Sequence, residues 1–495
     1  MKKINKKELI IYTIMFAITC AIFTPLLIGH YSTDTYNISN VGYQNYAIHW
    51  SLIDGRIFMA ILGLIASKIN ISIEAYTFIT LFSAIIISNL AIITLSKIIK
   101  KYKKPENIIQ EIIILIIGYI TIFNFMYLEN MYFVESTVMA TSVLLYIISA
   151  DILVEKNKNY IIKSIILTSL GIMCYQGTVG LFFAYVTLFT ILKNKNNEKQ
   201  IIIDLIKSGI IALISVSIDI LSVKVIENLI GQKQTRLGKI SDVFRNITII
   251  IASLPNVLQW TCNLFPRNLL IIYLGLLISI ILIYTIKNKE YKNDIVAKFV
   301  LITLITIAGS CVTYLLALTS FYTGRLRNAL GALIGILFIF IYVETDLLQK
   351  KNKLGIITFI TLISYLIINI LNYESIMIQH KEVNKLERIE SQEIEQYIEE
   401  YENNTENKVT NIALIVIRDN LEKAFLPNAK NKTSFTHNAI RTSWAADGAI
   451  NFYTNRNLKT VTLTQEEKQN YMENNNTEKG YKCIGDTLYL NVYMY

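Results

Sequence analysis

Long apolar stretches alternate with short polar segments over the first three quarters of the chain. An apolar run of about 18 or more residues is long enough to cross the hydrocarbon core of a bilayer as a helix. The pattern predicts about eleven such spans, at roughly residues 8–29, 74–96, 108–126, 134–153, 160–175, 178–193, 200–223, 268–286, 295–318, 328–346 and 354–373. We therefore expect a mainly α-helical, polytopic membrane protein.

Lysine residues cluster in alternate connections between these spans and are rare in the others, apart from one long loop. The lysine-rich segments are 2–7, 97–104, 156–163, 193–199, 287–292 and 350–353. Cytoplasmic loops carry an excess of lysine and arginine, so the pattern predicts a cytoplasmic N-terminus. It also predicts that the polar segment 30–56 lies outside. An odd number of spans then places the C-terminal region outside as well.

Two apolar segments on the predicted outer side do not fit a full span. Counting 57–73 as a span would invert every later loop and break the lysine alternation, so we predict a helix lying in or dipping into the outer interface. The outer loop 224–267 carries basic residues, including Lys233, Arg236 and Lys239, ahead of another apolar run. We predict that this loop forms a second interfacial element, anchored at lipid headgroups.

The composition changes near residue 374, where charged residues become frequent. Residues 381–402 predict a helix, and 411–419, 460–464 and 487–493 predict strands, with a further helix at 443–456. We expect a transmembrane domain at 1–373 and a small extracytoplasmic α/β domain at 374–495. The second domain has no His/Cys cluster, Gly-rich phosphate loop or nucleophile motif, so we expect it to bind or to pack against the outer loops.

Composition supports the membrane assignment. The chain has 495 residues, of which 53% are hydrophobic and 17% charged, and its mean hydropathy is positive. The net charge of +10 resides at the ends of spans, where it is a topology signal rather than a nucleic-acid site. The five cysteines have neither metal-ligand nor disulfide-framework spacing. Abundant isoleucine and an excess of lysine over arginine are typical of an AT-rich bacterial genome, so we expect the bacterial plasma membrane.

Acidic, amide, aromatic and basic side chains gather in the predicted outer loops. A carboxylate there can accept a proton from a sugar hydroxyl, while the planar fork of an arginine binds two phosphate oxygens. The side chains with this chemistry are Asp34, Asp54, Arg56, Glu129, Glu135, Tyr175, Gln176, Arg325 and Arg327.

Each of these residues also has an ordinary structural explanation. A single Asp in a loop is commonly a solvated turn residue or a helix cap, and Asp54 is expected to cap or orient the helix that follows Arg56. Arg325 and Arg327 could extend to the interface from a helix end. Glu129 and Glu135 are six positions apart, so at most one is expected to line a pocket. Asp219 is an isolated acid within a predicted span, and it either marks a functional site or lies near the outer interface.

Asp34–Thr–Tyr36, Trp50 and Gly55–Arg56, followed by an apolar helix, resemble the pattern of the Gtr (type II) O-antigen glucosyltransferase family. Tyr175–Gln176 also fits, and the resemblance extends over roughly residues 8–350. That family is similar to the GT-C superfamily, whose members take a sugar from a polyprenyl phosphate outside the membrane. The resemblance implies that Asp34 is the general base and that Glu129 or Glu135 is a second-loop acid. It also implies that Arg56 orients the site or contacts phosphate.

Members of that family often have paired acids where this chain has Thr33–Asp34. The departure favours a single-base mechanism without a metal, and no cofactor is expected. The predicted donor is a polyprenyl-phosphate-linked hexose such as glucose, with its phosphate near Arg56, Arg325 or Arg327. The predicted acceptor is a surface glycan such as teichoic acid or capsule. Tyr36 and Trp50 are expected to stack on sugar rings, with Tyr175 and Gln176 as further sugar contacts.

Other functions remain open at this point. A transporter or flippase of lipid-linked glycans is disfavoured because the chain has only five prolines and no repeat between its halves, whereas transporters commonly use broken helices and repeats. A glycan polymerase or ligase would use the same outer arginines. A sensor domain on an inert anchor would need far fewer spans. The bilayer is a partner in every case, and nucleic acid in none.

Overall fold

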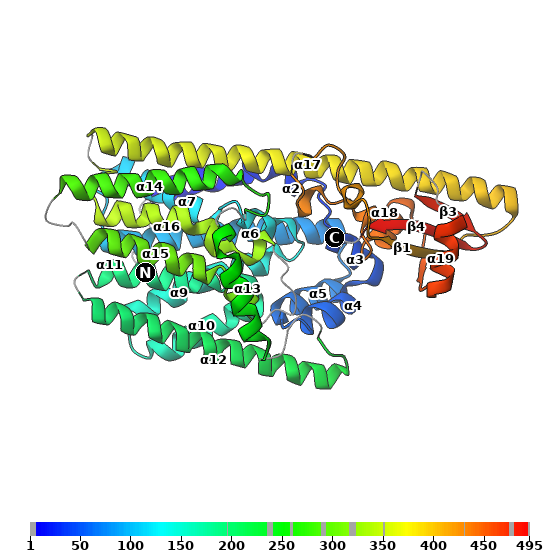
Figure 1. Cartoon of the computed structure of the whole chain (residues 1–495), viewed down its shortest axis with the longest axis horizontal. Coiled ribbons are helices and arrows are strands. Elements are labelled where there is room, and N and C mark those ends of the chain that lie inside the picture. Colours follow the sequence, from blue (N-terminus) through cyan, green and yellow to red (C-terminus); the bar gives the residue numbers. More distant parts are fainter. Residues whose placement is uncertain are drawn as a thin grey trace.

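One helix, α17 (Lys353–Thr405), connects the two parts of the molecule. In the computed structural model of the chain it extends along a bundle of helices and continues into a small sheet domain at one end (Figure 1). The structure describes residues 6–195, 197–234, 241–257, 261–288, 294–315, 323–349, 352–429, 431–474 and 480–493. At about 1.5 Å per residue, α17 is on the order of 80 Å long, so a bilayer can enclose only part of it.

The bundle is built from apolar helices that match the predicted spans. They are α1 (Lys6–Ile22), α6 (Ile73–Tyr102), α7 (Ile108–Ile122), α9 (Ser136–Glu155), α10 (Tyr160–Cys174), α11 (Gly180–Lys193), α12 (Glu198–Ile230), α14 (Arg267–Lys287), α15 (Asp294–Gly309), α16 (Asn328–Glu344) and α17. In the part of the chain that the structure describes, seven helical segments are long and apolar enough to cross a membrane. The helical membrane class is thereby confirmed. The number of eleven spans stays a prediction, because α1, α7, α10 and α16 are not among the seven.

Described lysines of the connections 97–104 and 193–199 form ion pairs at the end of the bundle away from the sheet domain. Lys100 pairs with Glu8 and Glu111, each at 2.9 Å, and Lys195 pairs with Glu344 at 2.9 Å. These ion pairs tie together the ends of α1, α6, α7 and α16. The sidedness of the membrane remains a prediction. The segregation of charge in space agrees with the alternation along the chain.

The predicted outer segment 30–56 folds into short helices. They are α3 (Thr33–Val41), α4 (Tyr43–Tyr46) and the π-helical η1 (Ala47–Leu52), followed by α5 (Ile57–Ile69). The predicted interfacial helix 57–73 therefore corresponds to α5, which buries Met59 and Ala60 and exposes Ile65 and Ile69. This one-sided exposure suits an interfacial helix, and its depth in a membrane is still a prediction.

The predicted outer loop 224–267 is helical over much of its length. Helix α12 continues to Ile230, and α13 (Asp242–Val257) crosses the bundle at a steep angle (Figure 1). Residues 235–240, which include Arg236 and Lys239, and residues 258–260 lie outside the described residues. Phe244 of α13 is 79% exposed, which is consistent with the predicted interfacial role.

The sheet domain contains the predicted strands and one more. The strands are β1 (Asn411–Ile417), β2 (Lys459–Val461), β3 (Tyr481–Ile484) and β4 (Thr487–Tyr493), in the order β2-β1-β4-β3. β1 is parallel to β2 and β4, and β3 pairs antiparallel with β4. Two helices accompany the sheet, α18 (Ala446–Thr454) and α19 (Gln465–Asn474). The second half of α17 packs on the sheet through Ile394 and Ile398.

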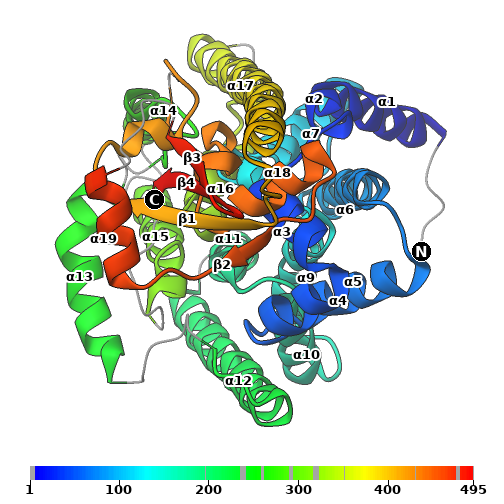
Figure 2. The same cartoon turned by 90° about the vertical axis from the view of Figure 1, so that its right-hand side faces the viewer.

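The sheet domain is closely joined to the outer segment of the bundle. Figure 2 looks onto this end and shows β1, α18 and α3 in front of the bundle helices. A Cβ at Gly448 of α18 would lie 2.4 Å from the backbone oxygen of Tyr36 in α3, so only glycine permits this approach. Asn40 donates a hydrogen bond of 2.8 Å to Asp447 across the same contact. Helix α17 also passes through position 374 without a break, although the composition changes there.

Candidate active site

A cavity of about 660 Å³ lies between the helix bundle and the sheet domain. Its walls come from α3, η1, the connection between α8 (Tyr127–Tyr132) and α9, η2 (Gln176–Thr178), α12, η5 (Gly324–Leu326) and the sheet domain. Seven of the predicted site residues line it, namely Asp34, Trp50, Arg56, Glu135, Tyr175, Gln176 and Arg325. Charged and polar residues that are far apart in sequence are therefore brought to one cavity.

Asp34 lies in the first turn of α3, and the start of this helix is firmly held. The Ser32 hydroxyl accepts a hydrogen bond of 3.3 Å from the backbone N–H of Thr35, completing a capping box. The backbone N–H of Thr33 donates to the Tyr132 hydroxyl at 3.3 Å. A carboxylate in the first helical turn is stabilised by the helix dipole. The fold therefore fixes the Asp34 backbone and leaves its side chain on the cavity wall.

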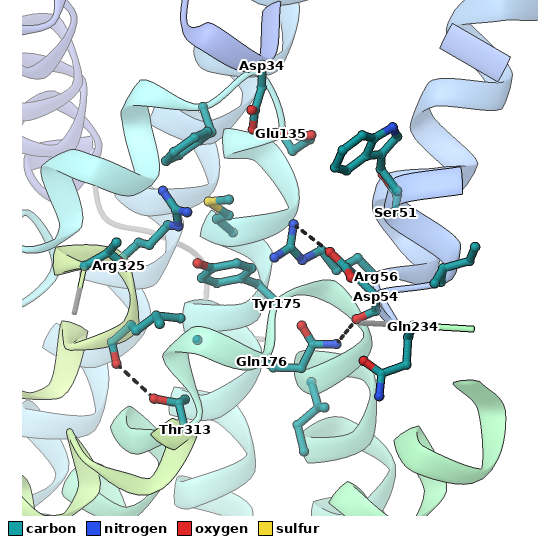
Figure 3. Close-up of a pocket in the computed structure, with 18 of the residues that line it drawn as sticks. Asp34, Ser51, Asp54, Arg56, Glu135, Tyr175, Gln176, Gln234, Thr313 and Arg325 are labelled. Atoms are coloured by element: carbon teal, nitrogen blue, oxygen red, sulfur yellow. Dashed lines mark hydrogen bonds and ion pairs between the residues drawn. The ribbon is translucent and has the colours of Figure 1, made fainter. Parts of the chain in front are cut away.

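Glu135 lies beside Asp34 at the upper part of the cavity (Figure 3). It precedes α9 and is only 3% exposed. Burial and then the charge of Asp34 raise the pKa of Glu135 to about 7, although Tyr46 and Arg56 act in the opposite direction. Among the described residues its buried Oε1 atom has no hydrogen-bond partner. Glu135 is therefore able to hold a proton near neutral pH.

Two arginines flank the ring of Tyr175 in the middle of the cavity (Figure 3). Arg56 Nη1 lies 3.9 Å from Asp54 Oδ2, and its guanidinium carbon is 5.6 Å from the Tyr175 ring centroid. The guanidinium carbon of Arg325 lies 4.2 Å from the Phe133 ring centroid. A pair of guanidinium groups facing one space is suited to an anion such as phosphate.

Glu129 does not line the cavity, and its oxygen atoms are occupied by other groups. It accepts a hydrogen bond of 2.8 Å from the backbone N–H of Arg325, and its Oε1 lies 3.7 Å from Arg325 Nη1. The Ser434 hydroxyl of the sheet domain also donates to it. The expectation that at most one of the two glutamates lines a pocket agrees with this arrangement. Glu129 positions Arg325 and is itself 3% exposed.

Arg327 and Tyr36 also lie outside the cavity lining. Arg327 is 2% exposed, and its Nε donates to the Tyr314 hydroxyl at 3.3 Å. Tyr36 is fully buried, where its hydroxyl donates to Glu387 at 2.8 Å and lies 2.7 Å from the Tyr453 hydroxyl. The predicted phosphate contact Arg327 thus packs within the bundle, and the predicted sugar-stacking ring of Tyr36 packs between α3, α17 and the sheet domain.

The Gly–Arg pair of the sequence pattern has a clear structural basis. Gly55 has φ of +76°, and a Cβ there would lie 2.8 Å from Gln176 Nε2 and 3.2 Å from Asp219 Oδ1. Gln176 Nε2 donates to the backbone oxygen of Asp54 at 2.9 Å. Glycine therefore allows the loop to turn and to approach Gln176. Asp54 pairs with Arg56, and α5 has no side-chain cap at its start.

Sequence reasoning missed several cavity residues. Asp219, which was noted as an isolated acid of possible function but was not assigned to the site, lines the cavity and accepts a hydrogen bond from Gln176 Nε2 at 3.5 Å. Ser434, His437 and Trp444 line it from the sheet domain. Trp444 was a possible signal, since the chain has only three tryptophans. Throughout the described ranges, no group of three or more His, Cys, Asp or Glu side chains is placed to hold a metal ion.

Fold and cavity define an integral membrane protein with a charged pocket at the end of its helices. The family model described as Glucosyl transferase GtrII matches residues 23–342, more than half of the chain. The chain belongs to this family and is a glycosyltransferase. The predicted resemblance is thereby confirmed, and the match ends before α17 and the sheet domain. No curated protein matches the chain.

Proposed function

We propose that this protein transfers glucose or another hexose from a polyprenyl-phosphate carrier to a surface glycan on the outer face of the bacterial plasma membrane. The observation that carries the proposal is that Asp34, Glu135, Arg56 and Arg325 line one cavity. These residues supply a base, a proton-holding acid and two phosphate-binding cations. Membership of a glucosyltransferase family favours this function over a transporter, a flippase or a sensor.

The proposed reaction is a single displacement. The Asp34 carboxylate accepts the proton of an acceptor hydroxyl, and the hydroxyl oxygen forms a bond to the anomeric carbon. The bond between the anomeric carbon and the phosphate oxygen breaks at the same time, and its electron pair leaves with the polyprenyl phosphate. Attack from the side opposite the leaving group inverts the configuration at the anomeric carbon. A positioned carboxylate contributes about 10²–10⁴-fold to such a step.

Arg56 and Arg325 bind the phosphate and stabilise the charge that develops on it as the sugar leaves. Preorganised cations in a pocket sheltered from water stabilise such a charge more strongly than they could in bulk solvent. Asp54 and Glu129 hold the two guanidinium groups in place at 3.9 Å and 3.7 Å. In this GT-C-type mechanism the arginines take the role that a divalent cation could otherwise fill, so no metal is required.

The lipid part of the donor would lie against the apolar side of the cavity. Ile172 of α10 and Val216 and Ile220 of α12 line this side. Residues Leu213, Leu221 and Val225 of α12 are exposed and apolar, as expected of a face in contact with lipid. A polyprenyl chain could therefore remain in the bilayer beside α12 while its phosphate reaches the arginines.

A direct test uses the purified protein in liposomes with polyprenyl-phosphoglucose. The donor is supplied together with polysaccharide extracted from cells that lack this protein. Such polysaccharide has not been modified by the protein and still carries free acceptor sites. We expect release of free polyprenyl phosphate together with incorporation of glucose into the polysaccharide. Movement of intact donor across the bilayer without cleavage would instead identify a flippase and refute the proposal.

A further inference from the structure

The cavity has a wall that belongs to the sheet domain, which lies outside the matched family region. Ser434, His437 and Trp444 form this wall and come from residues 431–445, here called the strap. The strap includes η7 (Ser434–Thr436) and η8 (Ala439–Arg441) and leads into α18. It is the part of the sheet domain that reaches the site.

The strap is firmly attached to the bundle and to α17. Ser434 donates to Glu129, and a ring nitrogen of His380 donates to the backbone oxygen of Phe435 at 2.9 Å. The Phe435 ring is fully buried, 4.7 Å from the ring of Tyr132. The backbone N–H of Ala439 donates to Glu387 at 2.6 Å. A surface held in this way is preorganised for binding.

Trp444 differs from the other residues of this wall because it is 40% exposed although it lines a cavity. Trp50, which also lines the cavity, is 43% exposed. The Trp444 ring lies 6.0 Å from the His437 ring, and the residue is still more than one third exposed at the cavity. The apolar face and the N–H group of an indole match a pyranose ring, which has C–H faces and a hydroxyl edge.

The strap presents no net charge to the cavity. Burial lowers the pKa of His437 to about 4, so this imidazole is neutral at pH 7 and can exchange hydrogen bonds with hydroxyl groups. No lysine lines the cavity among the described residues, and its two arginines lie beside Tyr175 (Figure 3). The strap residues that line the cavity, Ser434, His437 and Trp444, include no cation, so an anionic acceptor unit would find no opposite charge there.

We infer that the strap forms the acceptor subsite and that it binds an uncharged sugar unit of the glycan, with Trp444 as stacking platform and His437 as hydrogen-bonding group. The inference rests on the proposed function and assigns the sheet domain the role of choosing the acceptor. The donor lies toward α10 and α12, and the acceptor approaches from the strap. The two substrates meet where Asp34 and Glu135 line the cavity.

The test compares Trp444→Ala and Trp444→Phe with the wild type, using the donor and polysaccharide described above. Loss of the ring in Trp444→Ala should raise the KM for polysaccharide about tenfold or more, while the KM for donor changes by less than about twofold. Trp444→Phe should restore most of the affinity, because a flat aromatic face remains. Ile484→Ala is the matched control, since Ile484 is 41% exposed in the same domain and does not line the cavity.

Specific outcomes would overturn the inference. An unchanged KM for polysaccharide in Trp444→Ala, or an equal rise in both KM values, would show that the strap does not bind the acceptor. Partial hydrolysis of the labelled polysaccharide adds a second arm, in which the labelled glucose should be recovered linked to an uncharged sugar. Label recovered only on a sugar that carries a carboxylate or phosphate would contradict an uncharged sugar unit. A wild-type protein that releases no polyprenyl phosphate would refute the proposed function itself, which is a different result.

Discussion

Glu135 lies close enough to Asp34 for the charge of Asp34 to act on it. Burial and this charge together raise the pKa of Glu135 to about 7. Both side chains line the same cavity, with Asp34 held in the first turn of α3 and Glu135 placed just before α9. When a folded protein keeps a proton on a buried glutamate near neutral pH, its stability depends measurably on pH.

The first prediction concerns stability and pH in Glu135→Gln. The pKa of a glutamate in an unfolded chain is about 4.3. Between this pH and about 7, the folded state therefore binds more protons than the unfolded state. The contribution of Glu135 to stability therefore falls as pH rises through this window. Glutamine has no such dependence, so the Tm of Glu135→Gln relative to wild type should rise between about pH 4 and pH 8. A difference in Tm that is constant across this range would contradict the assigned pKa.

The second prediction separates Glu129 from Glu135. Glu129→Gln removes the charge that holds Arg325 but leaves an amide oxygen able to accept from its backbone N–H. We expect kcat/KM for the donor to fall by about tenfold or more, because the Arg325 fork is less well positioned. The midpoint of the pH–activity profile should stay in place, since Glu129 does not line the cavity.

Arg267→Lys is a suitable control for that experiment, because Arg267 is an exposed arginine away from the cavity. It should change kcat/KM by less than about twofold. A shift of the pH–activity midpoint in Glu129→Gln, with donor binding intact, would mean that Glu129 takes part in proton transfer. It would then be a catalytic acid instead of a positioning residue.

The third prediction uses two glycines with similar backbones. Gly55 and Gly29 have φ of +76° and +63°, so alanine is strained at both, by about 1–2 kcal/mol. At Gly29 a Cβ would meet nothing within 4 Å, whereas at Gly55 it would press on Gln176 and Val223. Gly55→Ala should therefore lower Tm more than Gly29→Ala and should also reduce transfer. Equal losses of stability with full activity in both variants would show that the close approach to Gln176 is unimportant.

Much of the fold follows directly from the chain. Apolar runs separated by lysines define the membrane helices because helix length and bilayer thickness are matched. The strands at 411–419 and 487–493 contain the β-branched and aromatic residues typical of a buried sheet. β3 was missed because four residues give too short a pattern. The sequence predicted two separate helices where α17 is one. The change in composition near residue 374 reflects a change in the surroundings of the helix, and a helix can pass from lipid to protein without a change in its backbone.

The candidate site was only partly predictable, for a related reason. Asp34, Arg56 and Tyr175–Gln176 were found because motif and loop placement both pointed to them. Tyr36 belongs to the same motif, yet it hydrogen bonds to Glu387 of α17, a contact that no local pattern reveals.

The cavity wall formed by the strap could not be predicted from the sequence for a different reason. Ser434 and Trp444 reach the cavity only through the packing of the sheet domain against the bundle. Long-range packing therefore decides which of the polar residues face the cavity.

The most direct test of the account is sugar transfer by Asp34→Asn. Asparagine keeps the shape of the side chain but cannot accept the proton, so polyprenyl phosphate release and glycan labelling should fall by about 10²-fold or more, with expression and Tm near wild type. Asp151→Asn, which removes an exposed ion pair with Lys101 at the opposite end of the bundle, should retain activity. Transfer at the wild-type rate by folded Asp34→Asn protein would contradict the central claim.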